Sequence, residues 1–240
     1  MCFPESTPPP SGCSETDLRG NYWTAEFGRN ATKPCDSDAS SSGAVGTSWW
    51  FCDLVLRKFL TSQPDRSDCK SPWLGDVEDM LSSGDNTATE VFSNSCSQCF
   101  LYFLLKVTEA IIKGISSSND MFGGDLSVVV DLLGQIIQIY NKDSEDVFSL
   151  TRNIYNISNT LLASFQAWTE LTDFDQRYRL STNILRIIDN TGFLFLSDHQ
   201  LSASEKNQTN FSFEHLKVIL DTIGPERSFS RCYDFEQVRI

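Results

Sequence analysis

The chain has 240 residues and a mass of 27.0 kDa, enough for one large domain or two modest ones. Hydrophobic residues make up 40% of it and charged residues 21%, so it can bury a core and is neither disordered nor collagen-like. The formal net charge of -13 repels phosphate backbones and anionic lipid surfaces, which argues against a nucleic-acid-binding protein.

The amino-terminal part divides into a proline-rich stretch and a cysteine-rich segment. Residues 1–12 contain three consecutive prolines, Pro8 to Pro10, and predict a stiff linker outside any core. From Cys13 to Cys69, aromatic residues are separated by Ser- and Gly-rich stretches, which predicts short strands joined by long loops. Because five of the eight cysteines lie within the first 69 residues, we expect a small module held together by disulfides.

Beyond the cysteine-rich segment the sequence has helical periodicity. An apolar stripe over Leu126–Tyr140 predicts a helix that Asp125 caps. A second stripe runs over Val147–Trp168, and a third begins at a capping-box pattern in Thr172–Asp175. Phe100–Ile115 predicts a further helix. Stripes of this kind are buried against one another, so we expect a helical bundle.

Strand-like alternation appears near the carboxyl end. Phe211 and Phe213 alternate with polar residues, and Leu216–Leu220 continues the alternation one residue out of phase. This predicts one strand with a bulge at Glu214-His215, closed by Gly224-Pro225. Since one strand is not stable alone, we expect the sequence to stop inside its next domain. The predicted class is α+β, mainly α.

The longest unbroken apolar run and the amino terminus both bear on the cellular compartment. Cys99–Leu105 is far shorter than the roughly 20 residues that cross a bilayer. The first residues, Met-Cys-Phe-Pro-Glu-Ser, have neither the basic start nor the apolar core of a secretory signal. The cysteines nevertheless favour the secretory pathway, so we expect a signal peptide upstream in a longer parent protein.

Four N-x-S/T sequons support the same compartment. Each one alone arises often by chance, but we predict all four as glycan acceptors, with Asn207 and Asn210 close enough for one glycan to hinder the other. The one inside the predicted second helix is the least favourable, because its side chain must face away from the helix's apolar stripe. The predicted acceptors are Asn30, Asn156, Asn207 and Asn210.

Several short motifs follow one another in a characteristic order. They are Cys13, Trp23, Gly28, Pro34-Cys35, Trp50, Cys52, Pro64-Asp-Arg-Ser-Asp-Cys69-Lys-Ser-Pro-Trp73, Phe122-Gly-Gly-Asp125-Leu126, Trp168-Thr-Glu-Leu171 and Asn190-Thr-Gly-Phe193-Leu-Phe-Leu196-Ser-Asp198. The set resembles the extracellular region of latrophilin-like adhesion G-protein-coupled receptors. The cysteine-rich part is similar to the family's hormone-receptor domain, and the helical part is similar to the helical half of its GAIN domain.

The resemblance implies a domain division and a disulfide pairing. It implies a linker at 1–12, a hormone-receptor domain at 13–72, the helical subdomain A of a GAIN domain at 73–205 and an incomplete β-sandwich subdomain B at 206–240. It also implies bonds from Cys13 to Cys52 and from Cys35 to Cys69, whereas four cysteines alone allow three pairings. The pairing of Cys2, Cys96, Cys99 and Cys232 stays open.

The function implied by the resemblance is non-catalytic. The chain would scaffold and orient the membrane-proximal region of a receptor at the extracellular face of the plasma membrane. Its partner would be the rest of that receptor, with an unknown extracellular protein ligand, no nucleic acid, no direct membrane insertion, no metal and no cofactor. An alternative is a secreted binding or decoy protein made of the same modules.

The sequence departs from the family in three places, one of which is Ser93–Leu105, a segment richer in apolar residues than the family pattern. The segment Asp53–Phe59 lacks the Gly-x-Trp ending expected before Pro64, so this loop of the module is expected to pack differently. The His-Leu-Thr or His-Leu-Ser cleavage motif that closes a complete GAIN domain is also absent. In His215-Leu216-Lys217 the lysine supplies no hydroxyl nucleophile, so we expect no self-cleavage.

An alternative of another class is a thiol oxidoreductase. Cys96-Ser-Gln-Cys99 has the spacing of a redox pair, but such a pair needs a preceding strand and a helix amino terminus to lower one thiol pKa. A helix is expected there and a strand is not. His199 and His215 have no ligand spacing to the pair, which argues against zinc. Structural cysteines are the favoured interpretation.

Overall fold

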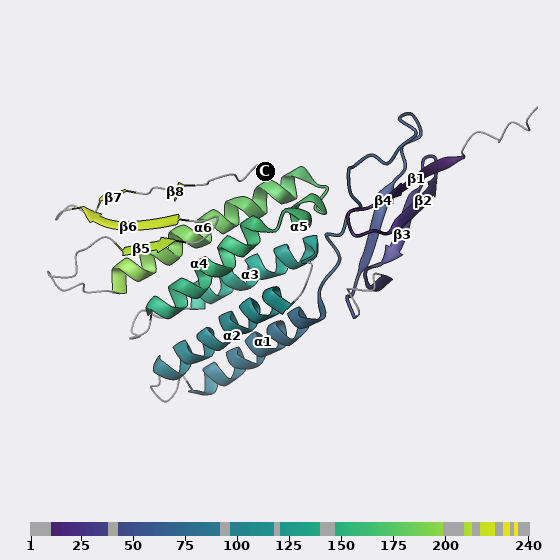
Figure 1. The fold of residues 1–240 in the computed structure, drawn as a ribbon. Helices are drawn as coiled ribbons and strands as arrows, with labels where there is room; N and C mark the ends of the chain where they lie inside the picture. The colour runs from purple at the N-terminus through teal and green to yellow at the C-terminus, as the bar shows by residue number, and fades with distance from the viewer. Residues whose placement is uncertain are drawn as a thin grey trace, which may run out of the picture.

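The computed structural model has a small β-rich module at one end of a bundle of helices, and a short sheet that lies beside the far part of the bundle (Figure 1). It describes residues 11–37, 43–91, 97–117, 121–139, 147–198, 209–212, 217–223, 228–230 and 233–234. The mixed α and β class agrees with the sequence prediction.

The module contains two separate antiparallel pairs of strands. In one pair Cys13 lies opposite Ala25, and in the other Ala31 lies opposite Trp50. Alternating burial along β2, β3 and β4 turns one side of these strands toward the module's interior. The elements are β1 Gly12–Thr16, β2 Tyr22–Glu26, β3 Asn30–Pro34, η1 Cys35–Ser37 and β4 Thr47–Phe51.

Two disulfides and three aromatic rings make the module's core. Cys13 is bonded to Cys52 and Cys35 to Cys69, the pairs that the resemblance implies. Trp50 meets Trp23 edge to face at 6.0 Å between ring centroids and stacks on Phe59 at 4.2 Å. Because so short a segment buries little apolar area, the two bonds account for much of its stability, about 2–4 kcal/mol each.

The bundle is built from long helices with a continuous apolar core. Each of the predicted apolar stripes faces this core; its fully buried residues include Leu104, Leu126, Leu133, Ile157 and Ile184. The elements are α1 Pro72–Val91, α2 Ser97–Ser117, α3 Gly123–Ile139, α4 Val147–Ala163, α5 Phe165–Thr169 and α6 Phe174–Asp198. In the part of the chain that is described, no helix has the length and apolar character to cross a bilayer.

Several helix ends differ from the sequence prediction. The predicted second helix is broken at Ser164, which separates α4 from α5. The last helix is capped by Asp173, whose Oδ1 accepts a hydrogen bond from the Asp175 amide at 2.9 Å, rather than by Thr172. Asp125 lies inside the first turn of α3 and accepts from the Phe122 amide at 2.9 Å. It therefore acts as the third helical residue of a capping box, not as the N-cap.

The carboxyl-terminal strands also differ. Instead of one bulged strand, β5 Thr209–Ser212 and β6 Lys217–Ile223 form an antiparallel pair in which Phe211 lies opposite Val218. Two further strands, β7 Ser228–Ser230 and β8 Tyr233–Asp234, pair with β6. The shift in the apolar alternation, which predicted a bulge, instead separates two antiparallel strands. The chain that follows β6 then adds two more strands to the sheet.

Candidate functional site

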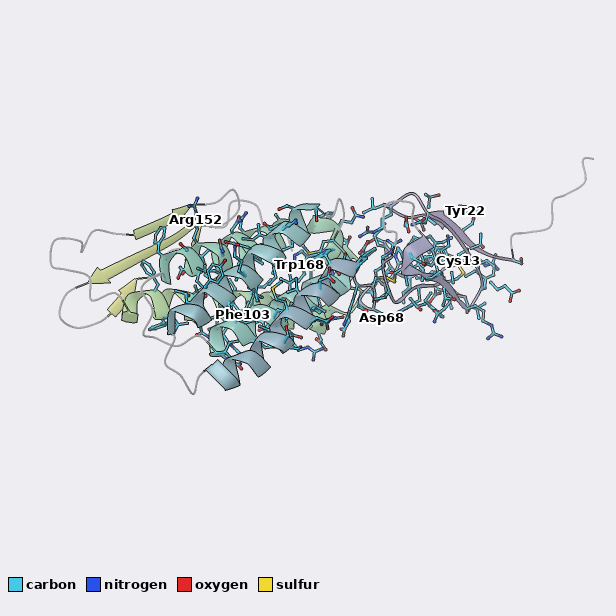
Figure 2. All side chains as sticks on the ribbon, turned by 90° about the horizontal axis from the view of Figure 1, so that it is seen from below. Cys13, Tyr22, Asp68, Phe103, Arg152 and Trp168 are labelled. Atoms are coloured by element: carbon cyan, nitrogen blue, oxygen red, sulfur yellow. A yellow bond between two sulfur atoms is a disulfide. The ribbon has the colours of Figure 1, made fainter. Side chains whose placement is uncertain are left out.

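The most elaborate polar arrangement lies where the module meets the bundle. Three of the motifs singled out in the sequence come together there, one before α1, one at the start of α3 and one at the end of α5. Figure 2 places the labelled Asp68 between the module, which holds Cys13, and the bundle, which holds Trp168. We call this contact the junction.

The centre of the junction is a buried chain of four alternating charges, Asp17, Arg66, Glu170 and Arg19. Arg66 Nη2 lies 2.8 Å from Asp17 Oδ2, and Arg66 Nη1 lies 3.0 Å from Glu170 Oε1. Arg19 Nε lies 2.6 Å from the same Glu170 oxygen. All four side chains are at most 2% exposed. Two cations and two anions therefore balance in charge within this buried chain.

Asp17 is held by donors from the module itself. Its Oδ2 accepts from Trp23 Nε1 at 2.7 Å, and its Oδ1 accepts from the amides of Arg19 and Asn21 at 2.9 Å each. These bonds fix the turn between β1 and β2 and tie it to the buried Trp23. A carboxylate with this many donors is a rigid acceptor for Arg66.

Glu170 brings the bundle to the same point. It follows α5 directly, and its Oε2 accepts from Arg19 Nη2 and from the Gly123 amide, both at 3.2 Å. Its main-chain oxygen accepts from the Arg66 amide at 2.9 Å. Arg19 also donates to the Met121 oxygen at 2.9 Å and lies 4.3 Å over the Phe122 ring. One glutamate therefore joins the module to two helices.

A second carboxylate, Asp125, ties the start of α1 to the start of α3. Its two oxygens accept from the Ser71 amide at 2.7 Å and from the Ser71 hydroxyl at 2.6 Å. A further contact joins the module to the bundle, since Asp65 Oδ2 accepts from the amide and hydroxyl of Thr172. The junction thus contains two further carboxylate contacts besides the ionic chain.

The backbone of Gly124 lies directly against the module. Its amide donates to the Arg66 oxygen at 3.1 Å. A β-carbon at this position would lie 2.2 Å from the Cys69 oxygen and 2.8 Å from the Ser67 oxygen, both main-chain atoms. Phe122 packs beside it with the Cys35–Cys69 disulfide. Only glycine permits this approach, which explains the second glycine of the Phe122-Gly-Gly-Asp125 motif.

The two buried aspartates have pKa values shifted in opposite directions. Burial alone would raise the pKa of Asp17, but the hydrogen bonds from Trp23 and Asn21 and the charge of Arg66 together hold it below its ordinary value of 3.8. For Asp125, burial prevails over the hydrogen bonds from Ser71 and Phe122, and its pKa is raised above 3.8.

We expect the two shifts to act on stability with opposite signs. Asp17, with its lowered pKa, contributes stability that is complete above pH 3.8 and is lost as the pH falls through its folded-state pKa. Asp125, with its raised pKa, binds its proton earlier in the folded protein and so offsets part of that loss. A ¹³C NMR titration should give Asp17 a pKa below 3.8 and Asp125 one above it. The reverse order would contradict the assigned environments.

The sequence-predicted sites lie apart from the junction, except for the second disulfide. Asn30 is exposed at the start of β3, Asn156 is half-buried within α4, and Asn210 lies in β5. Asn207, Cys2, Cys96, Cys232, His199 and His215 fall outside the described residues. Cys99 lies in α2. Among the residues described, no group of three or more His, Cys, Asp or Glu side chains could hold a metal ion.

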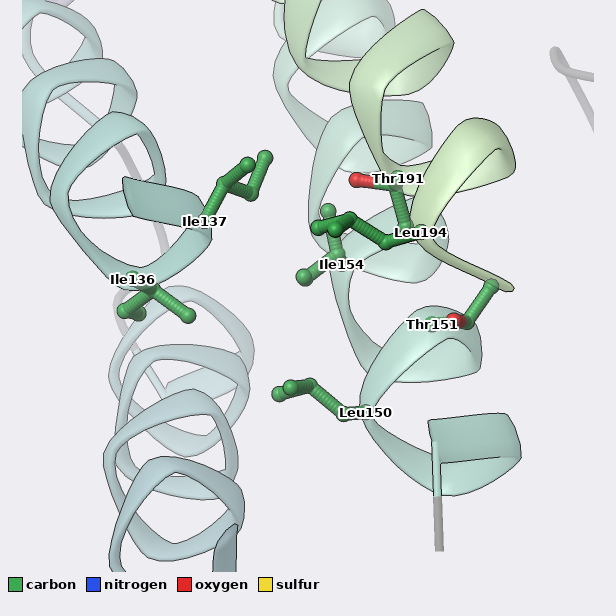
Figure 3. Close-up of a pocket in the computed structure, with 7 residues that line it drawn as sticks. All are labelled: Ile136, Ile137, Leu150, Thr151, Ile154, Thr191 and Leu194. Atoms are coloured by element: carbon green, nitrogen blue, oxygen red, sulfur yellow. The ribbon is translucent and has the colours of Figure 1, made fainter. Parts of the chain in front are cut away.

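The described part of the bundle includes two hollows. One, between α3, α4 and α6, is an apolar gap of about 10 Å³ lined by residues such as Ile136, Leu150 and Leu194 (Figure 3). It has room for one water molecule at most. The other is a surface groove of about 380 Å³ between α3 and α6, with Asp131, Gln135 and Arg186 among its lining residues. Neither brings together the groups of a catalytic site.

No protein-family model matches the chain.

Proposed function

We propose that this chain is a non-catalytic extracellular part of a latrophilin-like adhesion receptor. In this proposal the disulfide-bonded module is a hormone-receptor domain, the helices are the helical half of a GAIN domain, and the terminal strands belong to its β-sandwich half. The two parts are held as one rigid unit that orients the region next to the membrane. The rest of the receptor would be its partner.

The junction is the observation that carries this proposal. The motifs on which the resemblance rests are those that supply Arg66, Gly124 and Glu170. A buried ionic chain adds little stability over an apolar contact, but it fixes one relative orientation, because a shifted interface would leave charges unpaired. A part whose task is to hold two domains in a set geometry requires such a contact.

The two disulfides support the extracellular location. Bonds of this kind form and persist in oxidising compartments. The exposed sequon at Asn30 agrees with the same location.

Sequencing the transcript beyond the codon for Ile240 tests the receptor assignment. The proposal requires the remaining strands of a β-sandwich followed by seven apolar spans. A stop codon soon after Ile240 would refute it and would favour the secreted binding or decoy protein instead. Reading the transcript depends on neither expression nor folding of the protein.

We also expect the chain not to cleave itself. The dipeptide His215-Leu216 is followed by Lys217, which has no hydroxyl or thiol to attack the preceding carbonyl. After prolonged incubation at neutral pH and denaturation, the polypeptide should run at 27.0 kDa, apart from glycans. Two fragments with a new amino terminus at Lys217, formed in the presence of protease inhibitors, would contradict the non-catalytic assignment.

A further inference from the structure

The loop Asp53–Leu60, which follows β4, exposes an unusual group of aliphatic side chains. Leu54, Val55 and Leu56 are 63%, 86% and 54% exposed, and Leu60 is 57% exposed. Figure 1 shows the chain after β4 looping out from the module before it returns to α1. This is the segment in which the sequence departs from the family pattern. We call its first three aliphatic residues the tip.

The base of the loop is rigid. Cys52, which precedes it, is bonded to Cys13, and Phe59 is buried against Trp50 at 4.2 Å between ring centroids. The Asp53 amide donates to the Lys58 oxygen at 2.9 Å, and the Leu60 amide donates to the Phe51 oxygen at 2.9 Å. The tip is therefore presented in one conformation rather than exposed by a loose segment.

Two of the three backbone amides of the tip have acceptors within the loop. Asp53 Oδ1 accepts from the amides of Val55 at 2.7 Å and Leu56 at 2.6 Å. The Asp53 main-chain oxygen accepts from the Arg57 amide at 3.0 Å, which holds Arg57 at a left-handed φ of +53°. Moving an unpaired backbone N–H or C=O group from water into an apolar phase costs several kcal/mol. The Val55, Leu56 and Arg57 amides keep these acceptors when water is removed, which lowers the cost of moving the tip into an apolar phase.

Two cations follow the tip directly. Arg57 and Lys58 are both exposed, and the Arg57 guanidinium lies 5.9 Å from the Phe27 ring centroid. Long basic side chains beside an apolar surface extend to the level of phosphate groups while the aliphatic residues lie deeper. An aliphatic stretch followed by basic residues is typical of segments that lie in a membrane interface.

From these observations we infer that the loop Asp53–Leu60 inserts its tip into the surface of a phospholipid bilayer. A protein partner fits less well, because Leu and Val are under-represented among the residues that dominate protein interfaces. The net charge of -13 disfavours strongly anionic surfaces, so a zwitterionic phosphatidylcholine surface is the expected ligand. The loop would thereby give membrane affinity to a chain whose net charge of -13 argues against binding to anionic lipid surfaces.

Flotation of the purified chain with phosphatidylcholine vesicles tests this inference. The wild-type protein should float with the vesicles and remain bound at high salt, because insertion of aliphatic groups is not screened. Replacing Leu54, Val55 and Leu56 together by serine should lower the partition coefficient at least about tenfold. Asp53 and Arg57 are unchanged in this variant, and an unaltered melting temperature would show that the module stays folded.

The matched control replaces three exposed aromatic residues on the bundle, Phe165, Phe174 and Tyr178, by serine. This control should bind as the wild type does. A wild-type protein that does not float, or a tip variant that floats as well as the wild type, would overturn the inference. Self-association through the tip would also overturn the inference. In sedimentation it would appear as a smaller particle mass for the tip variant than for the wild-type protein.

A tryptophan at the tip gives an independent measure of depth. In a Val55→Trp variant, vesicles with brominated acyl chains should quench the added fluorescence. A Phe165→Trp variant on α5 should gain no such quenching. Equal quenching of both, or of neither, would overturn insertion by this loop, and neither outcome depends on the receptor assignment.

Discussion

Replacing Glu170 by glutamine should destabilise the protein by about 3–5 kcal/mol. Glutamine keeps the size of the side chain but removes the negative charge that lies 2.6 Å from Arg19 Nε and 3.0 Å from Arg66 Nη1. Arg66 would keep its ion pair with Asp17, whereas Arg19 would lose the negative charge closest to its Nε. Chemical denaturation followed by far-ultraviolet circular dichroism measures the change in the free energy of unfolding.

The matched control for this variant is Glu109→Gln. Glu109 also forms an ion pair, with Lys106 Nζ at 2.7 Å, but both side chains are about half exposed. Its Glu→Gln change is the same, and the exposed pair is expected to contribute nothing measurable. Equal losses for the two variants would show that burial at the junction is not what gives Glu170 its effect.

The second large effect is expected from Gly124→Ala. The added methyl group would lie 2.2 Å from the Cys69 main-chain oxygen, and neither backbone can yield without separating the module from α3. We expect the free energy of unfolding to fall by about 1–3 kcal/mol, because overpacking against main-chain atoms forces the module and α3 apart. Differential scanning calorimetry should show a lower melting temperature.

Gly134→Ala is the control on the same helix. A β-carbon on Gly134 has no atom within 4 Å, so the substitution adds helix propensity without a clash. It should stabilise the protein by up to about 1 kcal/mol. If Gly124→Ala were also neutral or stabilising, the close approach of the module to α3 would be wrong.

Local features of this fold were accessible from the sequence, and long-range ones were not. The apolar stripes predict where α3, α4 and α6 lie, because a helix must bury its apolar face wherever its neighbours are. The break at Ser164 and the reversal between β5 and β6 were missed. In both places the apolar pattern continues along the sequence while the structure separates two elements, α4 from α5 and β5 from β6.

The junction shows the same limit more sharply. Arg66 and Glu170 belong to motifs that the sequence analysis identifies, but those motifs do not predict which residues form ion pairs with them. Asp17 and Arg19 lie in an ordinary polar turn, and Arg19 is 151 residues from the glutamate that it contacts. A pairing over that distance depends on how whole elements pack. The one usable signal was the double glycine before Asp125, which indicates a close backbone approach.

The central claim is that the module and the bundle are one rigid unit, and amide hydrogen exchange at the junction tests it most directly. The Arg66 amide donates to the Glu170 oxygen at 2.9 Å and the Gly124 amide to the Arg66 oxygen at 3.1 Å, so both are released only when the junction opens. In the native wild-type protein, these two amides should be as strongly protected from exchange as the amide of Leu133 in the bundle core. All three should then exchange only through global unfolding. Rapid exchange at Arg66 and Gly124 while Leu133 stays protected would show that the two parts separate freely, and would contradict the account.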